Sequence, residues 1–133
     1  MADPIVVGTK CNWINDANTR IINLWDSNVA STAAHAMFDS SNNTAYTVPA
    51  GKIFTLLQVC GMPNYNTGGI LYIENSSITV AQLSTETTGG GSGMWATPLT
   101  VNLRIEFAAA NQVIVVHNQG TMHVNMIGVE TDV

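Results

Sequence analysis

Apolar and polar residues alternate along most of this chain, and a period of two is the side-chain spacing of a β-strand. The pattern is clearest at 99–107, where five apolar residues alternate with four polar ones. Such a strand turns one face to a core and the other to solvent. Further strands are predicted at 33–38, 45–48, 53–60, 69–75, 78–83, 112–118 and 122–129, and an apolar cluster predicts another at 21–25.

Proline and glycine fall between these segments. Pro49 and Gly51 form a predicted turn motif, because proline lacks the donor that a sheet needs and glycine tolerates a positive φ. The dipeptide Gln119-Gly120 predicts a tight turn that joins 112–118 and 122–129 into a C-terminal hairpin. With this two-residue turn, His117 and His123 lie on opposite faces and cannot share a metal ion. A three-residue turn is the alternative, and it would place the two histidines directly opposite each other as metal ligands.

Short strands separated by frequent turns, with no helical pattern, predict an all-β fold. We expect an antiparallel β-sandwich with jelly-roll-like connections, and a Greek-key barrel is the alternative. The 133 residues form one predicted domain, in which 1–32 supply an N-terminal arm and first strand and 33–133 supply the β-sandwich core. The predicted core residues are Phe54, Leu56, Leu103, Ile105, Val115 and Val124.

The segment 53–60 is apolar on both sides of the strand. It is therefore expected to be buried in the domain and again against a neighbour.

Charged residues are scarce. They make up 10% of the chain, against about 25% in an average soluble domain, and the net charge is −5. The polar surface is instead built from neutral residues, including 14 Asn and 15 Thr. A surface of this kind repels its own copies weakly, so the composition predicts a subunit that works within an assembly.

The same composition excludes two classes of partner. Four scattered basic residues cannot form the cationic stripe that binds nucleic acid. No apolar run approaches the roughly 20 residues that cross a bilayer, so no membrane partner is expected. The first residues lack the basic and long apolar regions of a secretory signal, which predicts assembly in a host cytoplasm.

Catalytic motifs are not recognised in the sequence. The segment 90–94 ends in Met where a nucleophile elbow needs Gly, and Gly51-Lys52 lacks the rest of a phosphate-binding loop. Cys11 and Cys60 have no partners at zinc spacing and are expected to be reduced thiols, with a disulfide between them as the alternative. We therefore predict a non-enzymatic protein with no catalytic residues, no metal ligands and no cofactor.

Aromatic residues beside glycine- and asparagine-rich segments are the candidate contact residues. Trp95 and Met94 follow a glycine-rich stretch, Tyr65 lies between two asparagines, and Trp13 lies in the N-terminal arm. Aromatic faces in such settings can stack on sugars, so a glycan is a candidate ligand. The 87–95 loop and the N-terminal arm are the predicted contact elements.

One segment extends the interpretation beyond composition. The sequence TAYTVPAGKIFTLLQV at 44–59 resembles the strand-turn-strand segment of small β-sandwich virion structural proteins of bacteriophages. The resemblance implies a capsid decoration or cement protein, or a minor capsid component. It also implies a homo-oligomer, usually a trimer, that binds a capsid or tail protein and resides in the virion. A receptor- or glycan-binding module at a spike or fibre tip is the alternative function.

Overall fold

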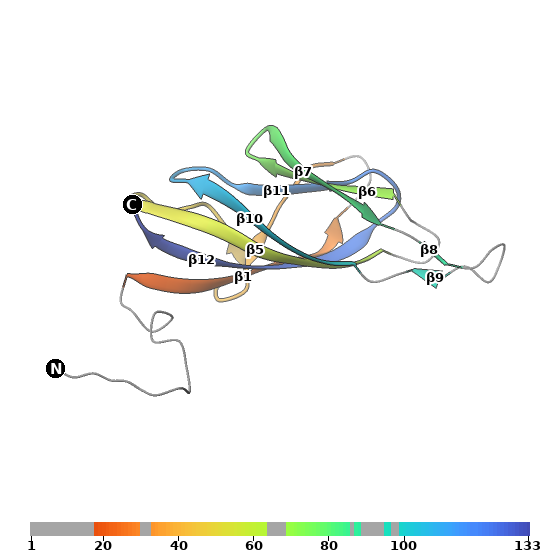
Figure 1. Ribbon diagram of the computed structural model, residues 1–133, viewed down its shortest axis with the longest axis horizontal. Helices are drawn as coiled ribbons and strands as arrows, with labels where there is room; N and C mark the ends of the chain where they lie inside the picture. The colour runs from red at the N-terminus through yellow and green to blue at the C-terminus, as the bar shows by residue number, and fades with distance from the viewer. Residues whose placement is uncertain (1–17, 30–32, 64–68, 86, 89–94, 97–98) are drawn as a thin grey trace, which may run out of the picture.

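The computed structural model describes residues 18–29, 33–63, 69–85, 87–88, 95–96 and 99–133. Every regular element in these ranges is a β-strand, and the principal strands form two stacked layers (Figure 1). The six-stranded sheet has the order β10 (Leu99–Ala108), β5 (Lys52–Pro63), β12 (Met122–Asp132), β1 (Thr19–Val29), β3 (Phe38–Asp39), β4 (Thr44–Ala45). The four-stranded sheet has the order β2 (His35–Ala36), β11 (Val113–His117), β6 (Gly69–Asn75), β7 (Ile78–Thr85), and β8 (Thr87–Thr88) pairs separately with β9 (Trp95–Ala96).

Strands from the beginning of the sequence lie beside strands from its end in both sheets. Its first strand, β1, lies beside its last, β12, and β2 lies beside β11. All these pairings are antiparallel, and the inner strands β5 and β6 then pair with β12 and β11. This interleaving is the strand order of a jelly roll. The predicted antiparallel β-sandwich is confirmed, and the alternative of a barrel is not observed because the two sheets remain separate.

The core fills the space between the inner faces of the sheets. Four of the six predicted core residues are fully enclosed there, whereas Leu103 and Ile105 are only partly buried against it. Aromatic rings continue the core towards one end, with the Phe54 ring centroid 5.9 Å from that of Phe107 and 5.2 Å from that of Tyr46. Gly128 lies directly under Phe54, where a Cβ atom would be 2.3 Å from the ring. This contact requires a residue without a side chain.

A β-bulge explains the doubly apolar segment at 53–60. Gly128 pairs with Leu56 and Ile127 pairs with Gln58, so Leu57 is an extra residue in β5. The extra residue shifts the alternation by one, which lets Phe54, Leu56 and Val59 all face the core. Leu57 itself is 37% exposed on the outer face.

The predicted C-terminal hairpin is wrong. Strand β11 pairs with β6 and β2, whereas β12 pairs with β5 and β1, so the two segments lie in different sheets. Residues 118–121 connect the layers rather than forming a two-residue hairpin turn. Val113 and Val124 therefore belong to opposite sheets, and both contribute to the core between them.

The segment 33–48 is also less regular than predicted. Residues 35–39 divide into β2 in one sheet and β3 in the other, with Met37 buried between them. The predicted strand at 45–48 is reduced to the short β4 and an isolated bridge from Thr47 to Gln112. This segment wraps from one layer to the other, so no long ladder can form.

Candidate interaction surfaces

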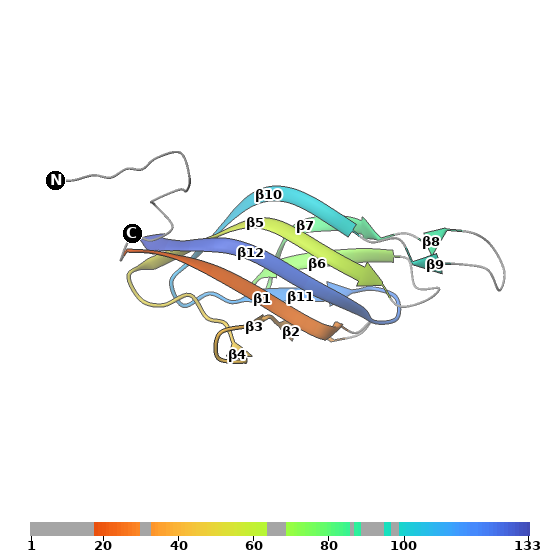
Figure 2. The same cartoon turned by 90° about the horizontal axis from the view of Figure 1, so that it is seen from below.

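The two borders of the sandwich are built differently. Figure 2 shows β1 to β4 along one border and the long strands β7 and β10 along the other. We call the border formed by β1 to β4 the closed side and the border formed by β7 and β10 the open side.

Backbone hydrogen bonds join the two sheets on the closed side. The Met37 amide donates to the Val113 carbonyl at 3.0 Å, and the Tyr46 amide donates to the Met37 carbonyl at 2.8 Å. Val48 continues the connection, because its amide donates to the Asn111 carbonyl at 3.0 Å. The segment 37–48 therefore seals this border of the core, where Ile22, Leu24 and Met37 are at most 1% exposed.

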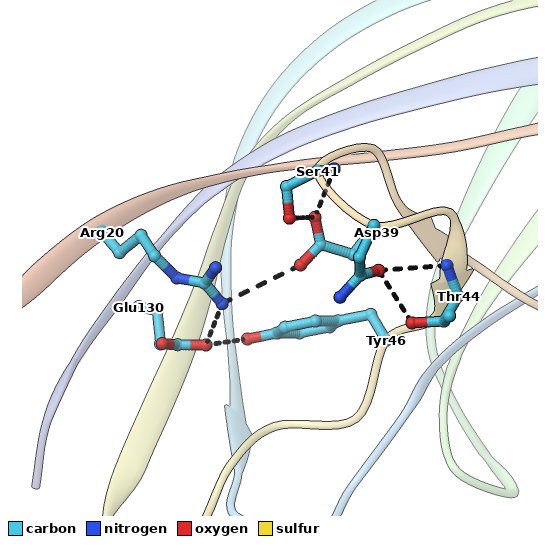
Figure 3. Close-up of polar contacts among 7 residues, drawn as sticks. Arg20, Asp39, Ser41, Thr44, Tyr46 and Glu130 are labelled. Carbon is cyan, nitrogen blue, oxygen red and sulfur yellow. Dashed lines mark hydrogen bonds and ion pairs between the residues drawn. The ribbon is translucent and has the colours of Figure 1, made fainter.

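Buried carboxylates add a polar network to the closed side (Figure 3). The Tyr46 hydroxyl donates to Glu130 Oε2 at 2.8 Å, and Arg20 Nη2 donates to the same oxygen at 3.4 Å. Arg20 Nη2 also lies 3.8 Å from Asp39 Oδ2, while Asp39 Oδ1 accepts hydrogen bonds from the Ser41 amide and hydroxyl. Four segments of the chain meet in this network.

Burial and the adjacent Glu130 carboxylate raise the pKa of Tyr46 far above its ordinary value of 10.0. The phenol is therefore protonated and donates to Glu130. A cavity of about 270 Å³ lies beside the network, lined in part by Arg20, Asp39, Asn42 and Tyr46. Both carboxylates face one arginine, which offsets part of the buried negative charge and links β1, β3 and β12.

A second polar pair connects the sheets on the same side. Asp26 of β1 is 5% exposed, and its Oδ2 lies 3.2 Å from Nδ1 of His35 in β2. Because β1 and β2 belong to different sheets, this pair adds a further contact between the layers.

The open side is less well covered. Ala81 and Leu83 of β7 and Leu99, Leu103 and Ile105 of β10 point towards the core but are only partly buried. Nearby, Ile78 is 69% exposed and Val80 is 39% exposed. Within the described residues, β7 pairs only with β6 and β10 only with β5. The apolar interior is thus partly accessible along this border.

The outer face of the six-stranded sheet is broad and uncharged at its centre. One row of paired residues crosses the sheet as Thr100, Cys60, Asn125 and Trp25. The next row crosses it as Asn102, Gln58, Ile127 and Asn23.

None of these eight residues carries a charge. Within the second row, Gln58 donates to Asn102 Oδ1 at 3.0 Å. Ile127 is 42% exposed in the same row, so the face combines amides with accessible apolar side chains. A cavity of about 220 Å³ at its margin is lined by Cys60, Met62, Thr100, His123 and Asn125, among others.

The charged side chains of the described part of the chain mostly neutralise one another. Lys52 pairs with Asp132 at one end of the sandwich, and Arg104 pairs with Glu106 at 3.3 Å on β10. Arg20 is held by the network on the closed side. Each described lysine or arginine therefore has a carboxylate partner, and the surface offers little free charge.

The turn motif at 49–51 lies between the closed side and β5. The Lys52 amide donates to the Pro49 carbonyl at 3.2 Å, and Gly51 has a φ of +76°. The preceding Tyr46 and Val48 are buried at the end of the core. The segment 44–59 that carries the resemblance thus supplies a corner and five core residues, which are Tyr46, Val48, Phe54, Leu56 and Val59. One of them, Tyr46, is also the partner of Glu130.

Most of the predicted contact residues lie outside the part of the chain that the structure describes. Met94, Tyr65 and Trp13 fall beyond the described residues, and Trp95 is described only as part of the backbone of β9. The N-terminal arm is described only from residue 18, where β1 already begins to join the sheet.

The polar network was not predicted from the sequence. Arg20 and Glu130 are 110 positions apart, so no local motif connects them. One signal existed: Glu130 follows Val124, Met126 and Gly128 at inward positions of β12. A charged residue in phase with a core row indicates a buried partner.

The histidines are dispersed. His117 is fully buried in the four-stranded sheet and its Nε2 lies 2.8 Å from Thr85 Oγ1, whereas His123 is exposed on the outer face of the other sheet. No group of three or more His, Cys, Asp or Glu in the described ranges could hold a metal ion. No helix among the described residues is long and apolar enough to span a membrane.

Comparisons with known proteins give one structural likeness. No protein-family model and no curated protein matches the chain. The chain is similar to a solved structure described as "Cyanophage Pam1 capsid asymmetric unit", with 15% identity and a TM-score of 0.43. The similarity covers 99% of this chain and 94% of that one. A likeness at this level does not establish a shared family or function.

Proposed function

We propose that this protein is a non-enzymatic virion structural protein, acting as a capsid decoration or cement protein or as a minor capsid component. In this role it packs against copies of itself and against a capsid or tail protein. The sequence resemblance at 44–59 supplies the virion context, and the uncharged outer face of the six-stranded sheet supplies the structural support. That face carries the proposal.

The face suits adhesion because its contacts need little removal of charge from water. Amide side chains such as Gln58 and Asn125 can exchange hydrogen bonds with water for bonds to a partner. Ile127 and Leu57 add apolar area, which gains free energy when it leaves water. A stable contact needs about 1,000 Å² in total, and the paired rows spread suitable residues across four strands.

The location can be tested on purified particles of the virus that encodes the chain. We expect mass spectrometry to find the protein in the particles and antibodies raised against it to label their surface by electron microscopy. Absence of the protein from intact particles would overturn the proposal.

The role of the outer face can be tested by adding recombinant protein to particles that lack it. We expect Asn125→Lys to reduce cosedimentation, because it places an unpaired charge at the centre of the face. Ser77→Lys adds the same charge in the exposed turn between β6 and β7 and should leave binding unchanged. Equal binding by both variants would contradict a role for this face.

The same assay distinguishes neutral adhesion from ionic attraction. Because exposed ion pairs are screened at about 1 M salt, an uncharged contact should survive sodium chloride at that concentration. Mild denaturant should weaken it. Release by salt but not by denaturant would show that charges carry the binding.

A further inference from the structure

The open side contains the long unpaired edges of the sandwich. In the described part of the chain, the edges of the two principal sheets are β10, β4, β2 and β7, and two of these strands, β4 and β2, have only two residues. Strands β7 and β10 have eight and ten residues and lie on the same border (Figure 2). A long edge exposes backbone donors and acceptors that another strand can pair with.

Strand β7 lacks most of the features that protect edges from pairing. Its sequence ITVAQLST contains no charge, proline or glycine. Edge strands commonly carry lysine, proline or inward charges that block association. Its protection is limited to a bulge, since Ala81 pairs with Ile73 and Thr79 with Glu74, which leaves Val80 as the extra residue. Beyond this bulge, 81–85 form a regular, uncharged edge.

Strand β10 differs in this respect. It carries Arg104 and Glu106, paired at 3.3 Å on its outer face, and its pairing with β5 is irregular between Asn102 and Ile105. Of the two long edges, β7 is therefore the better template for a further strand.

Burial indicates that a partner would cover apolar area as well as backbone. Ala81 and Leu83 of β7 and Leu99 and Ile105 of β10 face the core but remain partly accessible. On the closed side the corresponding residues, such as Leu24 and Met37, are fully buried. A second subunit on the open side would complete the cover that the chain itself provides elsewhere.

We infer that the open side binds a second copy of this chain, with β7 pairing antiparallel to β7 of that copy. Antiparallel pairing of β7 with β7 of the second copy uses the same surface on each copy, so the contact has two-fold symmetry. The other long edge, β10, lies on the same border (Figure 2). A register centred on Gln82 places Ala81 opposite Leu83 of the second copy and joins two four-stranded sheets into one. The uncharged strand introduces no repulsion against itself.

This inference rests on the proposed function, because it specifies how the structural subunit contacts itself. It differs from the trimer that the sequence resemblance implies. A trimer built through another surface would overturn the two-fold contact and leave the virion role intact.

The decisive measurement is the mass of the full chain in solution, by light scattering after size exclusion or by sedimentation. We expect twice the mass of one chain for the unmodified protein. Gln82→Lys should reduce the measured mass to that of a single chain, because it brings two like charges together across the symmetry axis. The side chain of Gln82 is exposed, so circular dichroism should remain that of the folded protein.

Ala108→Lys is the matched control, because it places the same charge at an exposed position on the other long edge, outside the two residue rows of the outer face. It should leave the mass doubled. A monomeric unmodified protein, a trimer, or an oligomer that dissociates with Ala108→Lys but not with Gln82→Lys would each overturn the inference.

The position of the contact on β7 can be tested without measuring the mass of the protein. With both native cysteines replaced by serine, Gln82→Cys should form a disulfide-linked dimer on mild oxidation, whereas Ala108→Cys should remain monomeric under denaturing, non-reducing conditions. Amide exchange in 81–85 should slow as protein concentration rises. Equal cross-linking of the two variants, or exchange independent of concentration, would contradict pairing at β7. Absence from particles would instead refute the virion role.

Discussion

The closed and open sides enclose the same core by different means. On the closed side, short strands wrap between the sheets, and a buried network joins Arg20, Asp39, Tyr46 and Glu130. On the open side, two long strands end the sheets and leave apolar residues partly accessible. The difference indicates that the chain completes one border by itself and leaves the other available for a partner.

The difference also concerns charge. The closed side buries its carboxylates and must neutralise them, so its contacts are specific and internal. The open side has an uncharged edge strand and an exposed ion pair on β10. Substitutions on the closed side should therefore reduce folding stability, whereas those on the open side should mainly alter association.

The largest effect is expected in the core beneath Phe54, between the two sides, where Gly128 leaves no room for a side chain. Gly128→Val should destabilise the fold by about 3 kcal/mol or more, because the new side chain overlaps the Phe54 ring and the Thr55 carbonyl. Urea unfolding measures the loss. Gly61→Ala is the control, since its Cβ would meet mainly the flexible end of Met122 and should cost less. Equal losses would contradict the assigned role of Gly128.

Removal of the phenol tests the polar network. Tyr46→Phe should lower the free energy of unfolding by about 2 kcal/mol, since Glu130 would lose a buried hydrogen bond to its carboxylate. Tyr72→Phe, on the less buried outer face of β6, should have little effect.

The same tyrosine predicts an alkaline limit. Its pKa is raised in the folded chain, whereas the unfolded chain ionises near 10.0, so stability should fall as pH rises above that value. Tyr46→Phe should weaken this pH dependence. An unchanged slope would exclude a buried, protonated phenol.

Ion pairs on the two sides provide a smaller contrast. Arg20→Met should cost about 1 to 2 kcal/mol, because Glu130 and Asp39 would lose their shared cation. Arg104→Met removes an exposed pair and should cost less than about 0.5 kcal/mol. Thermal unfolding of both variants gives the comparison. A larger loss for Arg104→Met would reverse the interpretation of the two sides.

The smallest expected effect is a pH dependence of folding stability that arises from His117, whose ring lies beside Thr85 at the end of β7. Burial lowers the pKa of His117 below its ordinary value of 6.5, so the unfolded chain takes up a proton more readily than the folded chain. The stability contributed by the neutral ring is present above that value and is lost as pH falls below it. His117 Nε2 lies 2.8 Å from Thr85 Oγ1, and the same Oγ1 accepts the Gly69 amide at 2.7 Å.

Urea midpoints measured across this range should fall more steeply for the unmodified protein than for His117→Gln. His123→Gln should preserve the steep slope, since His123 is exposed. Equal slopes for the unmodified protein and His117→Gln would show that His117 does not titrate differently on folding.

Local features of the fold could be predicted well. The strand at 69–75 has the predicted bounds, and β10 extends the predicted strand by one residue. In 99–107 apolar and polar residues alternate regularly, and side-chain alternation is a local consequence of the extended backbone. The bulge at Leu57 was not predicted, because an extra residue in one strand is defined only by the partner strands beside it.

For the candidate surfaces, the sequence predicts the scarcity of charge but not the location of each surface on the fold. Scarce charge indicated neutral contacts, yet the rows that form the outer face depend on the pairing of β10, β5, β12 and β1. The aromatic residues chosen from the sequence lie largely outside the described residues, so their role stays a prediction. The glycan-binding alternative stays a prediction with them.

The sequence by itself determined an all-β chain with a neutral surface, since period and composition are properties of neighbouring residues and of residue type. Only the tertiary structure decided that β11 and β12 belong to different sheets, that Glu130 meets Arg20 and Tyr46, and that one border is closed. The physical reason is that sheet partners are selected by burial and hydrogen bonding between residues far apart in sequence. Alternation states which face of a strand is apolar but not which strand will cover it.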